Sequence, residues 1–102
     1  MIYMDTIESR IDSASAVFRE NAEHMQAQVD GLNERLARVR QGGGTQAVER
    51  HESRGKLFVR DRIETLLDEG SPFLEFSTLA AWDCYDNEAP GAGIVTGVGT
   101  VS

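Results

Sequence analysis

Apolar residues recur at helical spacing in the first part of the chain. Seven of them are separated alternately by four and three positions: Phe18, Ala22, Met25, Val29, Leu32, Leu36 and Val39. This heptad pattern predicts an amphipathic helix with one continuous apolar stripe. Ser13 or Ser15 is suited to cap its start, and the three glycines at 42–44 predict its end. A flexible helix stop fits these glycines better than an anion cradle, because the Lys-Ser/Thr of a P-loop is missing.

A shorter 3, 4, 3 spacing precedes the stripe, from Met4 to Ala14. It suggests a helical extension over residues 4–12, although the phase shifts at the step to Ala22. A stripe of this length needs a surface to cover it, and the next helical region is too short to do so. We therefore expect the stripe to pack on another subunit or on a part of the protein outside this sequence.

The rest of the chain predicts short elements. A second helix begins near Thr45 and fades at Gly55, a third covers about Val59–Leu67, and the run from Asp68 to Pro72 ends it. Residues 73–79 are expected to be extended, and residues 81–90 form a polar loop with Trp82 and Tyr85. Residues 94–101 are β-branched apart from two glycines and predict a strand with no partner strand. Because an isolated strand cannot satisfy its backbone, we expect the chain to be the amino-terminal piece of a longer protein.

Composition narrows the function classes. The 102 residues suit one small domain or part of a larger one, and no apolar run approaches a bilayer span. A net charge of -7 argues against a general nucleic-acid binder, whose phosphate contacts need clustered bases. A single cysteine, Cys84, excludes an internal disulfide and suits a reducing compartment. The first twelve residues have the character of neither a secretory signal nor an Arg-rich transit peptide.

The charge is distributed unevenly. Residues 41–62 hold five bases and three acids, whereas residues 63–102 hold seven acids and no base. The five bases are Arg50, Arg54, Lys56, Arg60 and Arg62. Two interpretations remain open: a solvated helix face paired with neighbouring carboxylates, or a site for an anion or an acidic partner.

Other candidate motifs give weaker signals. The spacing Gly91-x-Gly93-x-x-x-Gly97 lies between a proline-bearing loop and a strand, whereas a dinucleotide loop must open a helix. We expect a turn into a strand there, with glycines where two backbones approach closely. His24, His51 and Cys84 show no metal-ligand spacing and no nucleophile pairing.

From Gly42 onward the chain resembles the start of a carboxyltransferase (beta) subunit of the biotin-dependent acyl-CoA carboxylases. The order and spacing of several blocks carry this resemblance: Gly42–Gly44, His51–Leu57, Arg60–Ile63, Leu66–Glu75, Tyr85–Glu88 and Pro90–Gly99. Phe18–Asn21 and Glu34–Val39 also look like the leading helix of the branch that acts on 3-methylcrotonyl-CoA. Ala92 favours that branch, since the propionyl-CoA branch usually has an acid there.

The resemblance implies an α/β fold in which amino-terminal helices lead into the first strands of a crotonase-like domain. Residues 1–41 would form the leading helical segment, and residues 42–102 the incomplete start of the carboxyltransferase domain. The family moves a carboxyl group from carboxybiotin to an acyl-CoA such as 3-methylcrotonyl-CoA, in leucine degradation. Its oxyanion-hole residues come after position 102, so no catalytic residue is expected here and the segment alone is expected to be inactive.

The resemblance also implies partners. Biotin would arrive on a separate biotin-carrying/biotin carboxylase subunit, and the full-length subunit would form a hexamer. Arg54 and Lys56 become candidates for holding the phosphates of CoA, or for anchoring the leading helices to the rest of the subunit. A bacterial cytoplasm is expected, or the mitochondrial matrix for a eukaryotic chain. Geranyl- and propionyl-type carboxylases, and a non-enzymatic helical dimerisation module, remain as alternatives.

Overall fold

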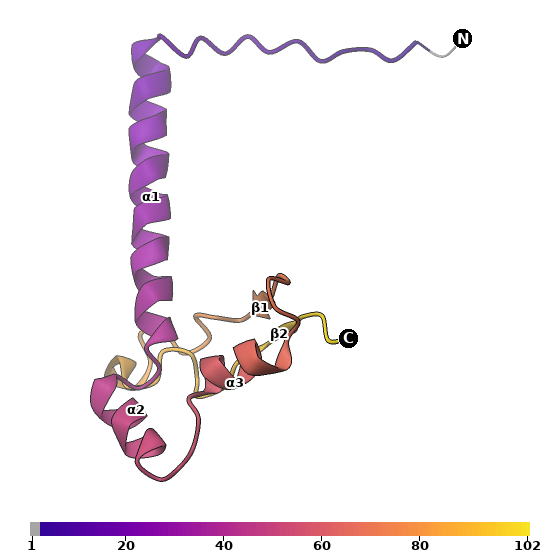
Figure 1. Ribbon diagram of the computed structural model, residues 1–102. Coiled ribbons are helices and arrows are strands. Elements are labelled where there is room, and N and C mark those ends of the chain that lie inside the picture. The colour runs from indigo at the N-terminus through magenta and orange to yellow at the C-terminus, as the bar shows by residue number, and fades with distance from the viewer. Residues whose placement is uncertain (1–2) are drawn as a thin grey trace. The chain divides into compact units, whose positions relative to one another are not determined.

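The computed structural model describes residues 3–102. The elements, in chain order, are α1 (Ala16–Arg40), α2 (Thr45–Glu52), α3 (Val59–Leu66), β1 (Leu74–Phe76), the 3-10 turn η1 (Tyr85–Asn87) and β2 (Thr96–Val98) (Figure 1). The chain divides into two compact units, of which the first ends at Gly31 and the second comprises Leu32–Ser102. The long helix α1 contributes to both. Among residues 3–102, no helix combines the length and the apolar character that a bilayer crossing requires.

The predicted first helix is confirmed, and Ser15 is the residue that caps it. The Ser15 hydroxyl oxygen accepts a hydrogen bond of 3.1 Å from the backbone N–H of Phe18, as an N-cap side chain does. At the other end, Gly42 adopts a φ of 66° and its N–H donates to the Val39 carbonyl at 3.0 Å. A positive φ at this position costs glycine little, so the helix ends where the glycines begin.

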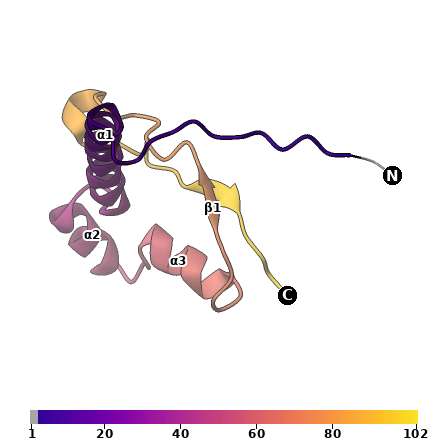
Figure 2. The same ribbon diagram turned by 90° about the horizontal axis from the view of Figure 1, so that it is seen from above.

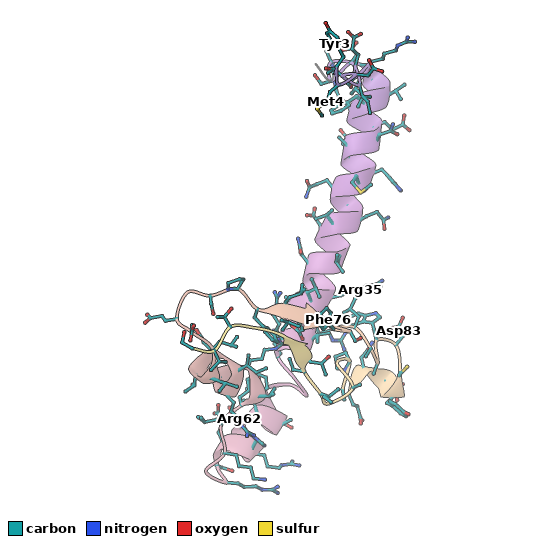
Figure 3. All side chains as sticks on the ribbon, turned by 90° about the vertical axis from the view of Figure 1, so that its right-hand side faces the viewer. Tyr3, Met4, Arg35, Arg62, Phe76 and Asp83 are labelled. Atoms are coloured by element: carbon teal, nitrogen blue, oxygen red, sulfur yellow. The ribbon has the colours of Figure 1, made fainter. Side chains whose placement is uncertain are left out.

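The predicted helical extension over residues 4–12 is wrong. These residues, among them Met4, have no regular secondary structure (Figure 3). Met4 and Ile7 are 88% and 96% exposed. Helices in proteins depend on burial of an apolar face for most of their stability. Here the apolar positions are exposed, and the phase shift before Ala22 puts them out of line with the stripe.

The two short helices begin where the sequence predicted. α2 starts at Thr45, and turns at 53–55 follow its last residue, Glu52. α3 starts at Val59 and ends at Leu66, one residue before the predicted end, because Leu67 is already extended (φ -76°, ψ 153°). Gly55 has a φ of 76°, which makes it the turn residue between the two helices.

β1 and β2 form an antiparallel two-stranded ribbon, in which Leu74 pairs with Val98 and Phe76 with Thr96 (Figure 2). The prediction that the terminal strand has no partner is therefore wrong. The expected extended segments at 73–79 and 94–101 supply the two strands of the ribbon. The approach of the backbones at Gly97 is confirmed, since a side chain there would meet the Leu74 carbonyl and the Phe73 ring.

The core of the second unit lies at the carboxyl end of α1. Val39 is 5% exposed and Ala81 7%, and Pro90 is buried beside them. The N–H of Ala81 donates to the Pro90 carbonyl at 2.9 Å and closes the polar loop. Next to it, the Trp82 ring lies 5.3 Å from the guanidinium carbon of Arg35 and 5.4 Å from that of Arg38. These cation–π contacts attach the loop to the last turns of α1.

Candidate functional site

The bases of residues 41–62 lie on α2, α3 and the connection between them. Arg54 and Lys56 are both exposed and flank Gly55 in this connection. We call residues 53–57 the basic turn. The N–H of Gly55 donates to the Glu52 carbonyl at 2.9 Å, and the Ser53 hydroxyl donates to the Arg50 carbonyl at 2.9 Å. These local bonds fix the backbone of the turn while both cationic side chains stay in solvent.

His51 holds the basic turn against the end of α2. Its Nε2 lies 3.0 Å from the Leu57 carbonyl oxygen, and the ring is half-buried. The imidazole therefore bridges the two ends of the turn, which is a positioning role.

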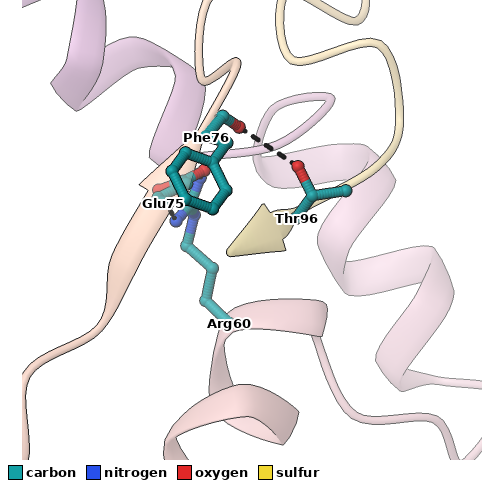
Figure 4. A network of polar contacts seen from close by, with 4 residues as sticks. All are labelled: Arg60, Glu75, Phe76 and Thr96. Carbon is teal, nitrogen blue, oxygen red and sulfur yellow. Dashed lines mark hydrogen bonds and ion pairs between the residues drawn. The ribbon is translucent and has the colours of Figure 1, made fainter. Parts of the chain in front are cut away.

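Arg60 is committed to an ion pair. Its two terminal nitrogens each lie 2.9 Å from a Glu75 carboxylate oxygen, which is a bidentate contact between α3 and β1 (Figure 4). The two side chains are 22% and 14% exposed, so this is a sheltered pair. Of the five bases, Arg60 is thus paired with a carboxylate, as the first interpretation of the basic region predicted. Arg54 and Lys56 are exposed to solvent, which leaves them accessible to an anion, as the second interpretation requires. Arg62 is exposed on α3 (Figure 3). Arg50 is exposed on α2.

An apolar pocket of about 280 Å³ lies next to the basic turn. His51, Phe58 and Arg60 line it from the α2–α3 side, and four glycines (Gly42, Gly43, Gly91 and Gly93) contribute backbone to its wall. Three of these glycines let the pocket's own side chains pack closely, since a Cβ at Gly42, Gly43 or Gly91 would stand 3.0–3.1 Å from Phe58, Ala47 or Val39. The sequence did not predict this pocket. Its glycines stood out only as a helix stop (Gly42 and Gly43) and as a turn before a strand (Gly91 and Gly93).

Other chemistry in the second unit is sparse. Within the part of the chain that the structure describes, no three His, Cys, Asp or Glu side chains gather as a metal site requires. Cys84 is exposed. The arrangement therefore places two exposed cations, Arg54 and Lys56, beside an apolar pocket.

Comparisons with known proteins assign this region to a family. The profile of the "Carboxyl transferase domain" matches residues 50–102. The chain is 49% identical over 98 residues to the "Probable methylcrotonoyl-CoA carboxylase beta chain, mitochondrial" of Drosophila melanogaster, which covers 95% of this chain and 17% of that protein. It is 56% identical over 71 residues to the "Biotin-dependent 3-methylcrotonyl-coenzyme A carboxylase beta1 subunit" of Mycobacterium tuberculosis, covering 70% of this chain and 13% of the relative.

A solved structure gives the same indication. The beta subunit of the geranyl-CoA carboxylase of P. aeruginosa superimposes with a TM-score of 0.77 at 38% identity, over 95% of this chain and 18% of that chain. The chain therefore spans less than a fifth of the length of the relatives that it matches.

Proposed function

Since the chain belongs to the carboxyl transferase domain family, we propose that it is part of the carboxyltransferase (beta) subunit of a biotin-dependent acyl-CoA carboxylase acting on 3-methylcrotonyl-CoA. The observation that carries this proposal is the match of nearly the whole chain to relatives named as methylcrotonoyl-CoA carboxylase beta chains. In this proposal the full-length subunit accepts a carboxyl group from carboxybiotin, which a partner subunit carries, and passes it to the acyl-CoA.

The assembly and fold of the whole subunit are parts of the same proposal. Residues 42–102 begin a crotonase-like domain, and residues 1–41 form its leading segment. Six full-length subunits associate into a hexamer. The enzyme works in the bacterial cytoplasm or, in a eukaryote, in the mitochondrial matrix. The eukaryotic relatives from Drosophila melanogaster, Dictyostelium discoideum and Arabidopsis thaliana are named mitochondrial, which supports the second location.

Substrate identity is tested with the full-length protein and its biotin-carrying subunit. ATP-dependent fixation of labelled bicarbonate is measured with 3-methylcrotonyl-CoA, geranyl-CoA and propionyl-CoA as acceptors. We expect the highest kcat/KM with 3-methylcrotonyl-CoA. A preference for geranyl-CoA would move the function to the alternative that the solved neighbour supports, and fixation with none of the three would overturn the proposal.

The role we propose for this segment is to hold the CoA portion of the substrate. CoA combines several phosphates with a flat adenine ring, and the basic turn with its neighbouring pocket offers cations beside an apolar wall. Arg54 and Lys56 contact the phosphates as charge-assisted hydrogen-bond donors. They position the substrate and take no part in proton or carboxyl transfer.

Replacing Arg54 and Lys56 with Ala tests this role. Loss of two exposed phosphate contacts is expected to raise the KM for acyl-CoA by roughly tenfold, with kcat little changed, because such contacts hold ground state and transition state alike. Arg10→Ala is the control, since Arg10 is exposed outside the basic turn. An unchanged KM in an intact assembly would assign Arg54 and Lys56 to anchoring the leading helices and would leave the substrate result untouched.

A further inference from the structure

The basic turn is attached to α2 on both of its sides. On the amino-terminal side, the backbone N–H groups of residues 53–55 donate to carbonyls in the last turn of α2 over 2.8–3.3 Å. On the other side, Nε2 of His51 lies 3.0 Å from the Leu57 carbonyl oxygen. Within residues 3–102, the backbone of residues 56 and 57 takes part in no other hydrogen bond. His51 therefore fixes the point at which the chain leaves the turn.

The chemistry of this contact assigns the proton. A carbonyl oxygen can only accept a hydrogen bond, so Nε2 of His51 is the donor. The neutral Nε2–H tautomer and the charged ring both carry that hydrogen, so both forms of the side chain can make the bond. The ring is half-buried, and it lines the apolar pocket, as Phe58 does. His51 thus contacts the pocket and the basic turn at the same time.

Two cations on one short turn bind the phosphates of a single CoA best while the turn keeps one shape. A site that is already held in its binding conformation loses less conformational entropy when the ligand arrives. We propose that His51 is the positioning residue of this site. Through its bond to the Leu57 carbonyl, it holds the basic turn in the conformation in which Arg54 and Lys56 reach the CoA phosphates together. This inference rests on the role proposed above for the basic turn.

Two other roles of His51 would have different consequences. A ring that only packs against the pocket wall would serve stability, and its loss would change kcat and KM together through a damaged fold. A ring that touches CoA itself would contribute to KM independently of the two cations. A positioning residue differs from both, because its effect on KM passes through Arg54 and Lys56.

Two amides at position 51 test the bond in the full-length subunit with its biotin-carrying partner. Gln places an amide N–H donor at about the reach of Nε2, whereas Asn carries the same amide one methylene shorter. His51→Asn is expected to raise the KM for acyl-CoA roughly fivefold with kcat little changed, and His51→Gln to stay within about 1.5-fold of the parent. Equal KM values for these two variants would overturn the proposal. His24→Asn is the matched control, since His24 is exposed on α1, and it is expected to keep the parental KM.

The coupling to the cations is measured by repeating His51→Asn in a protein that already carries Arg54→Ala and Lys56→Ala. There the change is expected to raise KM by less than about 1.5-fold, because the groups that His51 positions are gone. A rise as large as in the parent background would overturn the proposal and show that His51 acts on CoA directly. A parental KM in the protein that carries only Arg54→Ala and Lys56→Ala would refute the phosphate contacts themselves, and the positioning role with them.

Hydrogen exchange of the basic turn is a second readout that does not require activity. Residues 53–57 are expected to exchange faster in the His51→Asn protein than in the His51→Gln protein, and α1 equally in both. Equal exchange of the turn in the two proteins would overturn the proposal. Faster exchange of both the turn and α1 would also overturn it, because it would show that His51 serves the stability of the whole fold.

Discussion

Among single residues, Gly97 is the position where the ribbon leaves no space for a side chain. A Cβ atom there would collide with the Leu74 carbonyl oxygen and the Phe73 ring, whereas Gly31 in α1 has nothing within 4 Å of such an atom. Gly97→Ala is expected to lower the free energy of unfolding by about 1–3 kcal/mol, because strand separation has to change. Gly31→Ala is expected to raise it by up to about 1 kcal/mol through better helix propensity. Urea unfolding of the full-length protein measures both, and a Gly97→Ala protein as stable as the parent would refute the close approach.

Asp68 connects the end of α3 to the chain beyond β2. The Ser102 hydroxyl donates to its Oδ2 at 2.6 Å and the Ser102 N–H to its Oδ1 at 2.9 Å, and these bonds lower the pKa of the Asp68 carboxyl. A carboxyl with a depressed folded-state pKa stabilises the fold fully above its ordinary pKa of about 3.9. That stabilisation disappears as pH falls through the lower folded value.

Ser102→Ala tests this linkage through the pH dependence of unfolding. Because the variant loses the hydroxyl donor, its stability deficit is expected between pH 5 and 7 and should shrink as pH drops below about 4. Ser71→Ala is the matched control, since the Ser71 hydroxyl donates to the Asp68 backbone carbonyl at 2.6 Å and leaves the carboxylate alone. A deficit that stays constant across this pH range would contradict the assignment.

At the scale of elements, the start of α1 depends on one of two neighbouring serines. Ser15 caps the helix, whereas Ser13 lies two residues earlier, within a turn. Ser15→Ala is expected to lower the stability of the first turn by about 1 kcal/mol, and Ser13→Ala to have almost no effect. Amide hydrogen exchange at Phe18 and Arg19 measures the change locally. Faster exchange in the Ser13→Ala protein instead would reassign the cap.

The elements that the sequence predicted well are those with local signals. α1 begins at the Ser15 cap and ends at the glycines from Gly42 on, α2 lies between Gly44 and the turn at Gly55, and α3 ends just before the turn-forming run from Asp68 to Pro72. The ribbon could not be predicted, because Leu74 and Val98 are far apart in sequence and neither strand signals its partner. For residues 4–12 the sequence predicted a helix that does not form. Their apolar residues have helical spacing but are exposed, and helical spacing alone does not stabilise a helix without burial of the apolar face.

The sequence predicted a polar loop over residues 81–90 but not the backbone conformation of Asp83–Asn87 within it. Asp83, Tyr85, Asp86 and Asn87 adopt positive φ values of 51–61°, which non-glycine residues rarely do. The Asp and Asn side chains tolerate this conformation, and the side-chain amide oxygen Oδ1 of Asn87 accepts a hydrogen bond of 2.7 Å from the backbone N–H of Asp83. Tyr85 has no such compensation in its side chain and is 82% exposed. Local side-chain bonds and the Trp82 anchor thus hold a backbone path that residue propensities alone do not favour.

For the whole molecule, the distribution of charge is the property that could be predicted most directly from the sequence. The excess of bases between 41 and 62 was visible from composition, and the structure separates it into the paired Arg60 and the exposed Arg54 and Lys56. The pocket beside them was not visible, because its lining comes from 39–60 and from 89–95. Only tertiary packing brings these two stretches together.

This distribution leads to a prediction about salt. The segment is acidic overall, and the basic turn adds two exposed cations, Arg54 and Lys56, that can attract an anionic substrate. If Arg54 and Lys56 hold CoA phosphates, added salt should screen the attraction and raise the KM for acyl-CoA in the full-length enzyme, since the Debye length falls from about 10 Å at 0.1 M to about 3 Å at 1 M. Without these two cations, the KM for acyl-CoA should be higher at low salt and depend less on salt, because the attraction that salt screens is gone.

Steady-state kinetics at several chloride concentrations measure the salt dependence of KM for both proteins, and Arg10→Ala is expected to keep the salt dependence of the parent. Equal slopes in the parent and the double variant would place the phosphate contacts elsewhere in the subunit.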